Sequence, residues 1–286
     1  AVVEAIDRGD LRTALGFYAR ALELARADAD GERLDRAICN HSAVRISLGD
    51  HVAPRPLLRD VLTRNRSRAA CFLAADNLSR AYEYAKTFKK GLFYARVARS
   101  HARALGRPEW LASTYNQSGN CLLGLSYFAE AADEYAHALA LFPADSTSPV
   151  RTALEANVGY CAMMRGEVRR GLALSLRSLR RFRRLGNRQQ QAAIHLDCCY
   201  GYLECGQLTR ARRHGSRALA LAEAIWDGER VKNALFLLGE TARAAGDQDA
   251  AVRRFDRLQK TFYPDQPHLT DLLVHLEMRQ VVNLRA

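Results

Sequence analysis

One short stretch of the sequence, "HLDCCYGYLEC", gathers the residue types that could hold a metal ion or supply a nucleophile. On a helix, His195 and Cys199 would share a face because they are four residues apart. A structural zinc site needs four ligands, however, and no second pair of Cys or His accompanies this one. Cys199 also stands in register with Gly119, Gly159 and Gly239, as expected of a small residue in a packed core. We therefore expect no metal site and no cofactor here.

Signatures of catalysis are missing from the rest of the sequence. There is no His-Glu-x-x-His, no glycine loop for phosphates, no Gly-x-Ser-x-Gly elbow and no arrangement of paired carboxylates. The sequence therefore predicts a protein that is not an enzyme.

Arginine is concentrated in one part of the chain. Residues 151–217 include 14 arginines and four acidic residues, whereas the total net charge is only +12. In the helical pattern of residues 168–185, leucines at three- and four-residue steps form an apolar stripe, and arginines fall on another, solvent-facing side. The same side continues into neighbouring segments, which predicts a basic ridge of Arg170, Arg177, Arg180, Arg181, Arg184, Arg188, Arg210, Arg213, Arg217 and Arg257.

This basic ridge has two interpretations. It could bind nucleic-acid phosphates, another anionic surface or an acidic protein, or it could simply face water, as most exposed charged helices do. No aromatic side chains interleave the arginines on that face, which argues against base stacking with RNA. An acidic protein and a nucleic acid stay open as partners of the ridge.

A second set of polar residues recurs at intervals of 37 or 40 residues. We name it the amide row: Asn40, Asn77, Gln117, Asn157 and Asp197, with Asn116 beside it. Three residues further along lies the second row: Arg80, Asn120, Tyr160, Tyr200 and Glu240. Side-chain amides offer both donors and an acceptor, so a line of them suits the backbone of an extended peptide. Alternatively, these amides could bond a neighbouring helix of the protein itself.

The elements that position these residues follow from an internal repeat of about 40 residues. A small-residue column runs through Ala14, Pro54, Gly91, Ala131, Gly171, Ala211 and Ala251. Five residues earlier a turn column runs through Gly9, Gly49, Lys86, Ser126, Gly166, Gly206 and Gly246. Apolar residues recur at helical spacing on both sides of each turn. Each period is thus predicted to be helix A, a tight turn and helix B, and no β-strand pattern occurs.

These columns resemble the tetratricopeptide repeat family. The residues that match its pattern in order are Tyr115, Gly119, Leu122, Ala131, Tyr135, Ala138 and Pro143. The family's usual period is about 34 residues, so the chain resembles a variant with longer helices. The resemblance implies an all-α, right-handed superhelical solenoid of antiparallel helix pairs. It also implies a groove lined by helix A residues that binds a protein or peptide.

The sequence predicts one continuous domain. Residues 1–263 form the repeat array, with about six full helix pairs after a partial first one, and residues 264–286 form a closing helix of the same domain.

Seven cysteines without a disulfide pattern indicate a reducing, cytoplasmic setting. No apolar run approaches the roughly 18 residues of a spanning helix, so we expect no membrane insertion.

We therefore predict a non-enzymatic scaffold that holds a peptide or partner segment through the amide row and the second row. Two alternatives stay open. One is binding of nucleic acid or an anionic surface by the basic ridge, and the other is a sensor or assembly region of a larger bacterial-type regulator. The sequence names no partner and no oligomeric state.

Overall fold

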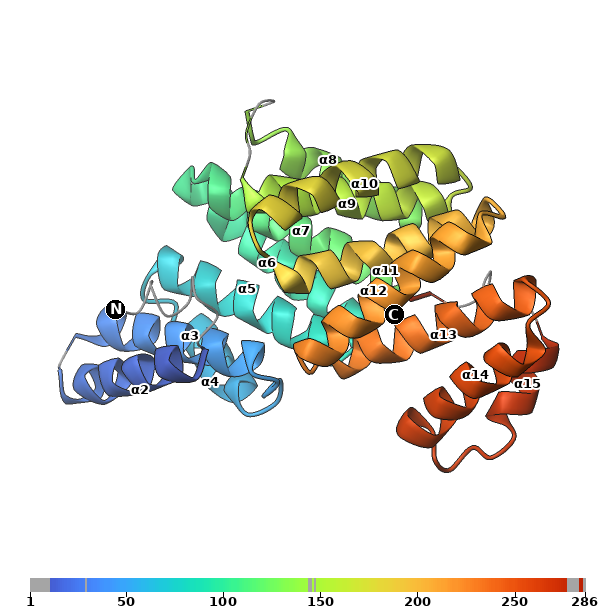
Figure 1. Ribbon diagram of the computed structural model, residues 1–286. Helices are drawn as coiled ribbons and strands as arrows, with labels where there is room; N and C mark the ends of the chain where they lie inside the picture. The colour runs from blue at the N-terminus through green and yellow to red at the C-terminus, as the bar shows by residue number, and fades with distance from the viewer. Residues whose placement is uncertain (1–10, 29, 144–145, 147, 277–282, 285–286) are drawn as a thin grey trace. The chain divides into compact units, whose positions relative to one another are not determined.

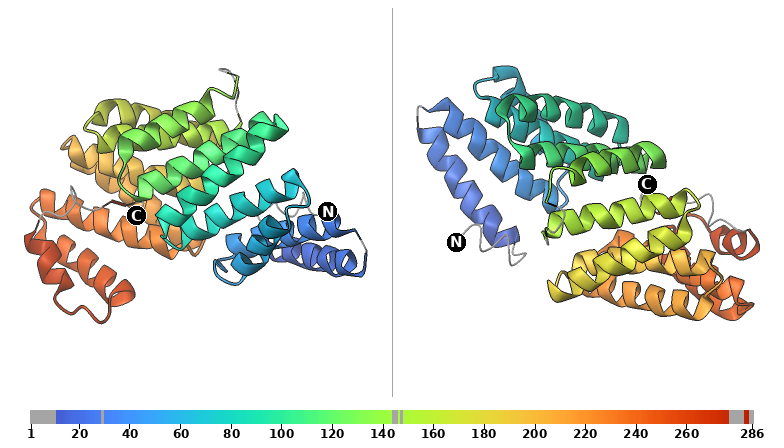
Figure 2. Two further views of the ribbon diagram at one scale, coloured as in Figure 1. Left: turned by 180° about the vertical axis from the view of Figure 1, so that it is seen from behind. Right: turned by 90° about the horizontal axis from the view of Figure 1, so that it is seen from above.

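The computed structural model describes residues 11–28, 30–143, 146, 148–276, 283 and 284, and within these residues it is all-helical. The chain divides into two compact units, and the boundary in the sequence falls between Leu141 and Phe142. Within each unit, helices that follow one another in sequence pack side by side (Figures 1 and 2).

Unit 1 contains the first seven helices of Figure 1. They are α2 (Leu11–Ala27), α3 (Gly31–Ser47), α4 (Pro54–Arg64), α5 (Arg68–Tyr84), α6 (Phe88–Leu105), α7 (Pro108–Gly124) and α8 (Phe128–Leu139). Unit 2 contains α9 (Pro149–Met164), α10 (Val168–Arg184), α11 (Arg188–Glu204), α12 (Leu208–Ala224), α13 (Gly228–Ala244), α14 (Gln248–Phe262) and α15 (Leu269–His275). Within the described residues this gives six pairs of helix A and helix B, from α3 with α4 to α13 with α14. Here α2 is the helix B of the partial first repeat.

The turn column lies at the end of each helix A, as predicted. Gly49, Gly166, Gly206 and Gly246 have φ between 68° and 98°, and the two other residue types in the column adopt the same left-handed conformation. These are Lys86, with φ of 56°, and Ser126, with φ of 64°. Gly9 lies outside the described residues. The turn is therefore kept even where its residue has a side chain that disfavours it.

The small-residue column lies where helix B approaches helix A. Every member, from Ala14 to Ala251, is buried. The closest approach is at Gly171 of α10, where an added Cβ would lie 2.3 Å from the main-chain oxygen of Gly159 on α9. At Gly119 of α7 an added Cβ would lie 2.6 Å from the ring of Tyr135 on α8. Glycine is thus required in these pairs so that the two helices can pack closely.

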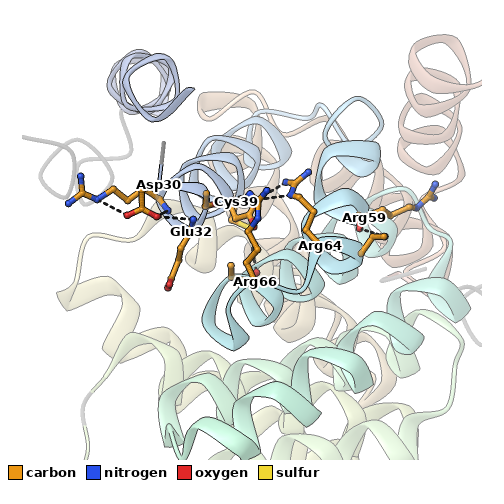
Figure 3. Close-up of polar contacts among 11 residues, drawn as sticks. Asp30, Glu32, Cys39, Arg59, Arg64 and Arg66 are labelled. Carbon is orange, nitrogen blue, oxygen red and sulfur yellow. Dashed lines mark hydrogen bonds and ion pairs between the residues drawn. The ribbon is translucent and has the colours of Figure 1, made fainter. Parts of the chain in front are cut away.

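A buried acid joins consecutive helices near the start of unit 1. The fully buried carboxylate of Asp35 on α3 accepts hydrogen bonds from Arg64 Nε at 3.0 Å and from Arg64 Nη2 at 2.6 Å. Arg66 Nη1 lies 3.7 Å from the same oxygen and donates to Gly31 O. Figure 3 shows Arg64 and Arg66 extending toward the part of α3 that holds Cys39. The end of α4 and the loop after it are thereby fixed to α3.

The predicted closing helix is short in the described part of the chain. Residues Leu269–His275 form α15, which packs against α14. Residues 277–282, 285 and 286 of the predicted segment 264–286 lie outside the described residues. Asn283 and Leu284 are described, and neither is helical.

Candidate functional site

The amide row and the second row share one face of the helix A segments, which we call the helix-A face. In unit 1 the amide row is mostly turned into the protein. Asn77 of α5 is buried, and its Nδ2 donates to the main-chain oxygen of Cys39 on α3 at 2.9 Å. Asn40 is half-buried. For Asn77, the contact with a neighbouring helix that the sequence left open is therefore present.

The α7 members of the two rows are linked by hydrogen bonds. Asn120 Nδ2 donates to Gln117 Oε1 at 3.3 Å, and Tyr135 Oη donates to Asn120 Oδ1 at 2.8 Å. Gln117 is buried, whereas Asn116 and Asn120 are half-buried. The phenol of Tyr135 on α8 thus orients the amide of Asn120 on the α7 part of the face.

Beside these amides lies a cluster of charged side chains on α5. Asp76, Arg80 and Glu83 follow one another at steps of four and three residues, which places them on one side of the helix. Arg80 Nη2 donates to Ser47 Oγ on α3 at 3.0 Å, and Ser113 Oγ on α7 donates to Asp76 Oδ1 at 3.1 Å. Charged and polar groups from three consecutive helix A segments therefore meet in unit 1.

The pKa values of both carboxyl groups in this cluster, those of Asp76 and Glu83, are raised. Burial, with a smaller contribution from the nearby Asp76, raises the pKa of Glu83 to about 7 against the opposing effects of Asn120 and Arg80. Burial also raises the pKa of Asp76, although Arg80 and the hydrogen bond from Ser113 oppose it. Near neutral pH, Glu83 can therefore either donate or accept a hydrogen bond.

In unit 2 the residues of both rows are more deeply buried. Tyr160 of α9 and Glu240 of α13 have no exposed surface, and Asp197 and Tyr200 of α11 are buried as well. Asn157 is half-buried. Glu240 accepts a hydrogen bond from Arg243 Nη2 at 2.8 Å within its own helix. Its carboxylate therefore has a partner in α13 itself.

A non-helical segment of the chain contacts the helix-A face of unit 2. Asn233 Nδ2 on α13 donates to the main-chain oxygen of Leu284 at 2.7 Å. Tyr160 Oη on α9 donates to Asn283 Oδ1 at 3.3 Å. A side-chain amide of a helix A thus binds a backbone carbonyl of a segment that folds back from 51 residues further along the chain.

The rows predicted from the sequence omit several residues that take part in these contacts, among them Asp76, Glu83, Ser113 and Asn233 on helix A segments. Asp76 and Glu83 lie within one helical turn of Arg80 and could have been found by extending the face along α5. Ser113 and Asn233 are both six residues before a helix A glycine, and two intervening repeats have alanine there. Because the residue type varies at this position from repeat to repeat, the sequence pattern did not reveal these two polar residues.

The basic ridge separates into arginines with acidic partners and arginines without them. Arg177 Nη2 and Arg181 Nη1 lie 3.3 and 2.8 Å from Glu155 Oε2, and the carboxylate of Glu155 is buried. Arg170 pairs with Glu167, and Arg257 pairs with Glu223. Arg210 donates to Gln207 Oε1 at 2.7 Å. Among the described residues no carboxylate pairs with the other ridge members, namely Arg180, Arg184, Arg188, Arg213 and Arg217.

Within the described part of the chain, no group of three His, Cys, Asp or Glu side chains is placed to hold a metal ion. All seven cysteines have free thiols, and six of them are buried. No helix among the described residues is long and apolar enough to cross a lipid bilayer.

Comparison with known proteins identifies the fold. No protein-family model matches the chain. No curated protein sequence matches it either. The structure is similar to that of a Rap protein in complex with competence and sporulation factor, with a TM-score of 0.77 at 14% identity over 96% of this chain and 78% of that one. It is also similar to NprR in complex with its cognate peptide NprX, with a TM-score of 0.75 at 13% identity over 96% of this chain and 80% of NprR.

A third similar structure is that of aspartyl phosphate phosphatase F from Bacillus subtilis. Its TM-score is 0.63 at 16% identity, over 85% of this chain and 65% of the phosphatase. These likenesses confirm the all-α fold of tetratricopeptide-like helix pairs that the sequence predicted.

Proposed function

We propose that the protein is a non-enzymatic scaffold whose helix-A face binds an extended peptide or a segment of a partner protein. The observation that carries the proposal is the bond from Asn233 Nδ2 to the main-chain oxygen of Leu284. In this contact, a side chain of the helix-A face recognises backbone without depending on the identity of the bound side chain. An incoming peptide offers the same carbonyl group.

The contact between Tyr160 and Asn283 supports the same proposal at a second point. Asn233 and Tyr160 lie on α13 and α9, which are separated in unit 2 by the helix pair α11 and α12. A ligand that reaches both is extended rather than a single small group. Tyrosine suits such a surface, because its ring gives contact area and its hydroxyl gives a directed hydrogen bond.

Two of the similar structures are complexes with competence and sporulation factor or with the peptide NprX, so the fold is compatible with ligands of this class. We place the protein in the cytoplasm, because seven free thiols suit a reducing compartment. We also keep the proposal of one continuous repeat array over residues 1–263 with residues 264–286 closing it.

The test uses the intact chain and peptides selected on it from a displayed random library. We expect the double variant Asn233→Ala, Tyr160→Phe to bind a selected peptide with an affinity at least about tenfold lower, because each change removes a hydrogen bond worth on the order of 1 kcal/mol. Gln248→Ala, which shortens an exposed side chain at the start of α14, is the control and should leave the affinity unchanged. The proposal is wrong if no peptide is enriched, or if both variants bind the peptide equally well.

A further inference from the structure

A groove of about 890 Å³ lies in unit 2 between α10, α11 and α12, and none of its lining residues belongs to the amide row or the second row. Figure 1 shows these three helices in succession along the unit. Arg180 and Arg183 of α10 line one side, and Arg213 and Arg217 of α12 line the other. No acidic side chain lines the groove. Its electrostatic potential is therefore strongly positive.

These four arginines differ from their neighbours on the same helices. Arg177 and Arg181 of α10 are held by the buried Glu155. In the described part of the chain, none of the four groove arginines has a carboxylate partner, and all four are exposed. Like charges around one groove repel one another, so an anion that enters it gains attraction from several guanidinium groups at once.

Two buried histidines form the base of the groove. Arg183 Nη2 lies 3.4 Å from His195 Nε2, and His195 Nδ1 lies 3.0 Å from His214 Nδ1. An arginine can only donate, so His195 Nε2 accepts and the proton of His195 is on Nδ1. His195 then donates to His214 Nδ1, which leaves the proton of His214 on Nε2. The pair thus presents one N–H group that has no acceptor among the described residues.

Both histidines are neutral at physiological pH. Burial, together with His214 and three arginines, lowers the pKa of His195 to about 3. Burial, together with Arg213 and Arg183, lowers the pKa of His214 to about 4. The order of donors from Arg183 through His195 to His214 is therefore fixed, and the Nε2–H of His214 is available to a ligand.

We propose that this groove binds a small molecule that carries at least two phosphate groups. Guanidinium groups match phosphate oxygens in bidentate geometry, and four of them exceed what one phosphate group needs. The volume lies within the roughly 300–1,000 Å³ of small-molecule sites. The aromatic rings in the lining, those of His195, His214 and Tyr202, are all buried and offer no surface for stacking a nucleic-acid base. This site is independent of peptide binding by the helix-A face.

Calorimetric titration of the intact chain with sodium tripolyphosphate, pyrophosphate and orthophosphate at constant ionic strength tests the proposal. We expect tripolyphosphate to bind most tightly. Arg180→Gln with Arg217→Gln should weaken it by at least about tenfold, because charge-assisted hydrogen bonds are lost. Arg170→Gln with Arg212→Gln removes the same charge from the same two helices, at arginines that face Glu167 and Asp247. This control should change the affinity by less than about twofold.

Further titrations distinguish the sources of the phosphate groups. If ATP binds more tightly than tripolyphosphate, the groove recognises a nucleotide. If the two bind equally, the groove recognises the phosphate chain alone. If both double variants lose the same affinity for tripolyphosphate, binding depends only on the total positive charge, and the proposal is wrong. Binding of a single-stranded RNA oligonucleotide without binding of tripolyphosphate would also overturn it.

Nitrogen-15 NMR of the histidine side chains gives a second measurement. We expect the proton on Nδ1 of His195 and on Nε2 of His214, and we expect the Nε2–H signal of His214 to move when tripolyphosphate is added. The signal should not move in the Arg180→Gln, Arg217→Gln variant. A proton on Nδ1 of His214, or an unmoved signal in the native chain, would contradict the proposed geometry.

Discussion

Polar side chains that a helix buries act here as connectors between neighbouring helices. The side-chain amide of Asn77 donates to the main chain of the preceding helix A. The carboxylate of Glu155 pairs with three arginines, Arg151, Arg177 and Arg181. Two of these three, Arg177 and Arg181, belong to the predicted basic ridge. Sequence periodicity predicted them on a polar side of the helix, but it could not reveal Glu155 on α9 as their partner. An arginine run is therefore a poor measure of unpaired charge.

At the same scale, the histidine pair makes stability dependent on pH. The pKa of His195 is lowered to about 3 and that of His214 to about 4, whereas an unfolded histidine titrates near 6.5. The unfolded state therefore takes up protons first as the pH falls, and the free energy of unfolding should decrease from about pH 6.5 toward pH 4. Above pH 6.5 the pair contributes its full stabilisation.

Urea denaturation of the native chain and of His214→Gln at pH 7 and pH 5 measures this effect. The native chain should lose more stability between the two values than the variant does, whatever the variant's stability at pH 7. Equal losses would show that the pair is not buried in its neutral form.

Among the elements, the turn between helix A and helix B was the most predictable feature. The turn column has positive φ at every described position, including Lys86 and Ser126, because register and not residue type decides it. The helix pairs followed from the same columns. The extent of the closing helix stays a prediction, because α15 covers Leu269–His275 and residues 277–282, 285 and 286 of the predicted segment 264–286 lie outside the described residues.

Close packing of helix A on helix B gives a prediction at this scale. In Gly171→Ala the new Cβ would lie 2.3 Å from Gly159 O, so α9 and α10 must separate. We expect a loss of about 2 kcal/mol in the free energy of unfolding, as in overpacked cores. Gly16→Ala in α2 is the matched control, because an added Cβ meets nothing within 4 Å there. It should stabilise the chain by about 1 kcal/mol through helix propensity. A neutral Gly171→Ala would contradict the close approach.

For the molecule as a whole, the sequence indicated which face of the repeats carries polar side chains, but not what lies against it. Asn283 is 123 residues from Tyr160, and no periodicity links the two. The amide row and the second row could be predicted because each position of the repeat occurs several times in the sequence. Asn233 and the segment at Asn283 and Leu284 occur once, so the sequence offered no pattern for them.

The segment that folds back should compete with an external peptide for the helix-A face of unit 2. Asn283→Ala removes the acceptor for Tyr160 Oη and should weaken the internal contact. Because the face is then more often open, a selected peptide should bind a few-fold more tightly to this variant than to the native chain. Calorimetry with the same peptide measures the difference. Weaker binding to the variant would mean that Asn283 assists the peptide instead of competing with it.

Photo-crosslinking with a selected peptide tests peptide binding by the helix-A face most directly. A benzophenone amino acid replaces either Glu229, an exposed residue one helical turn before Asn233 on α13, or Gln248, at the exposed start of α14. Peptide binding at the helix-A face predicts a crosslinked product from position 229, lost when unlabelled peptide is added in excess, and none from position 248. A product from position 248 alone would contradict it.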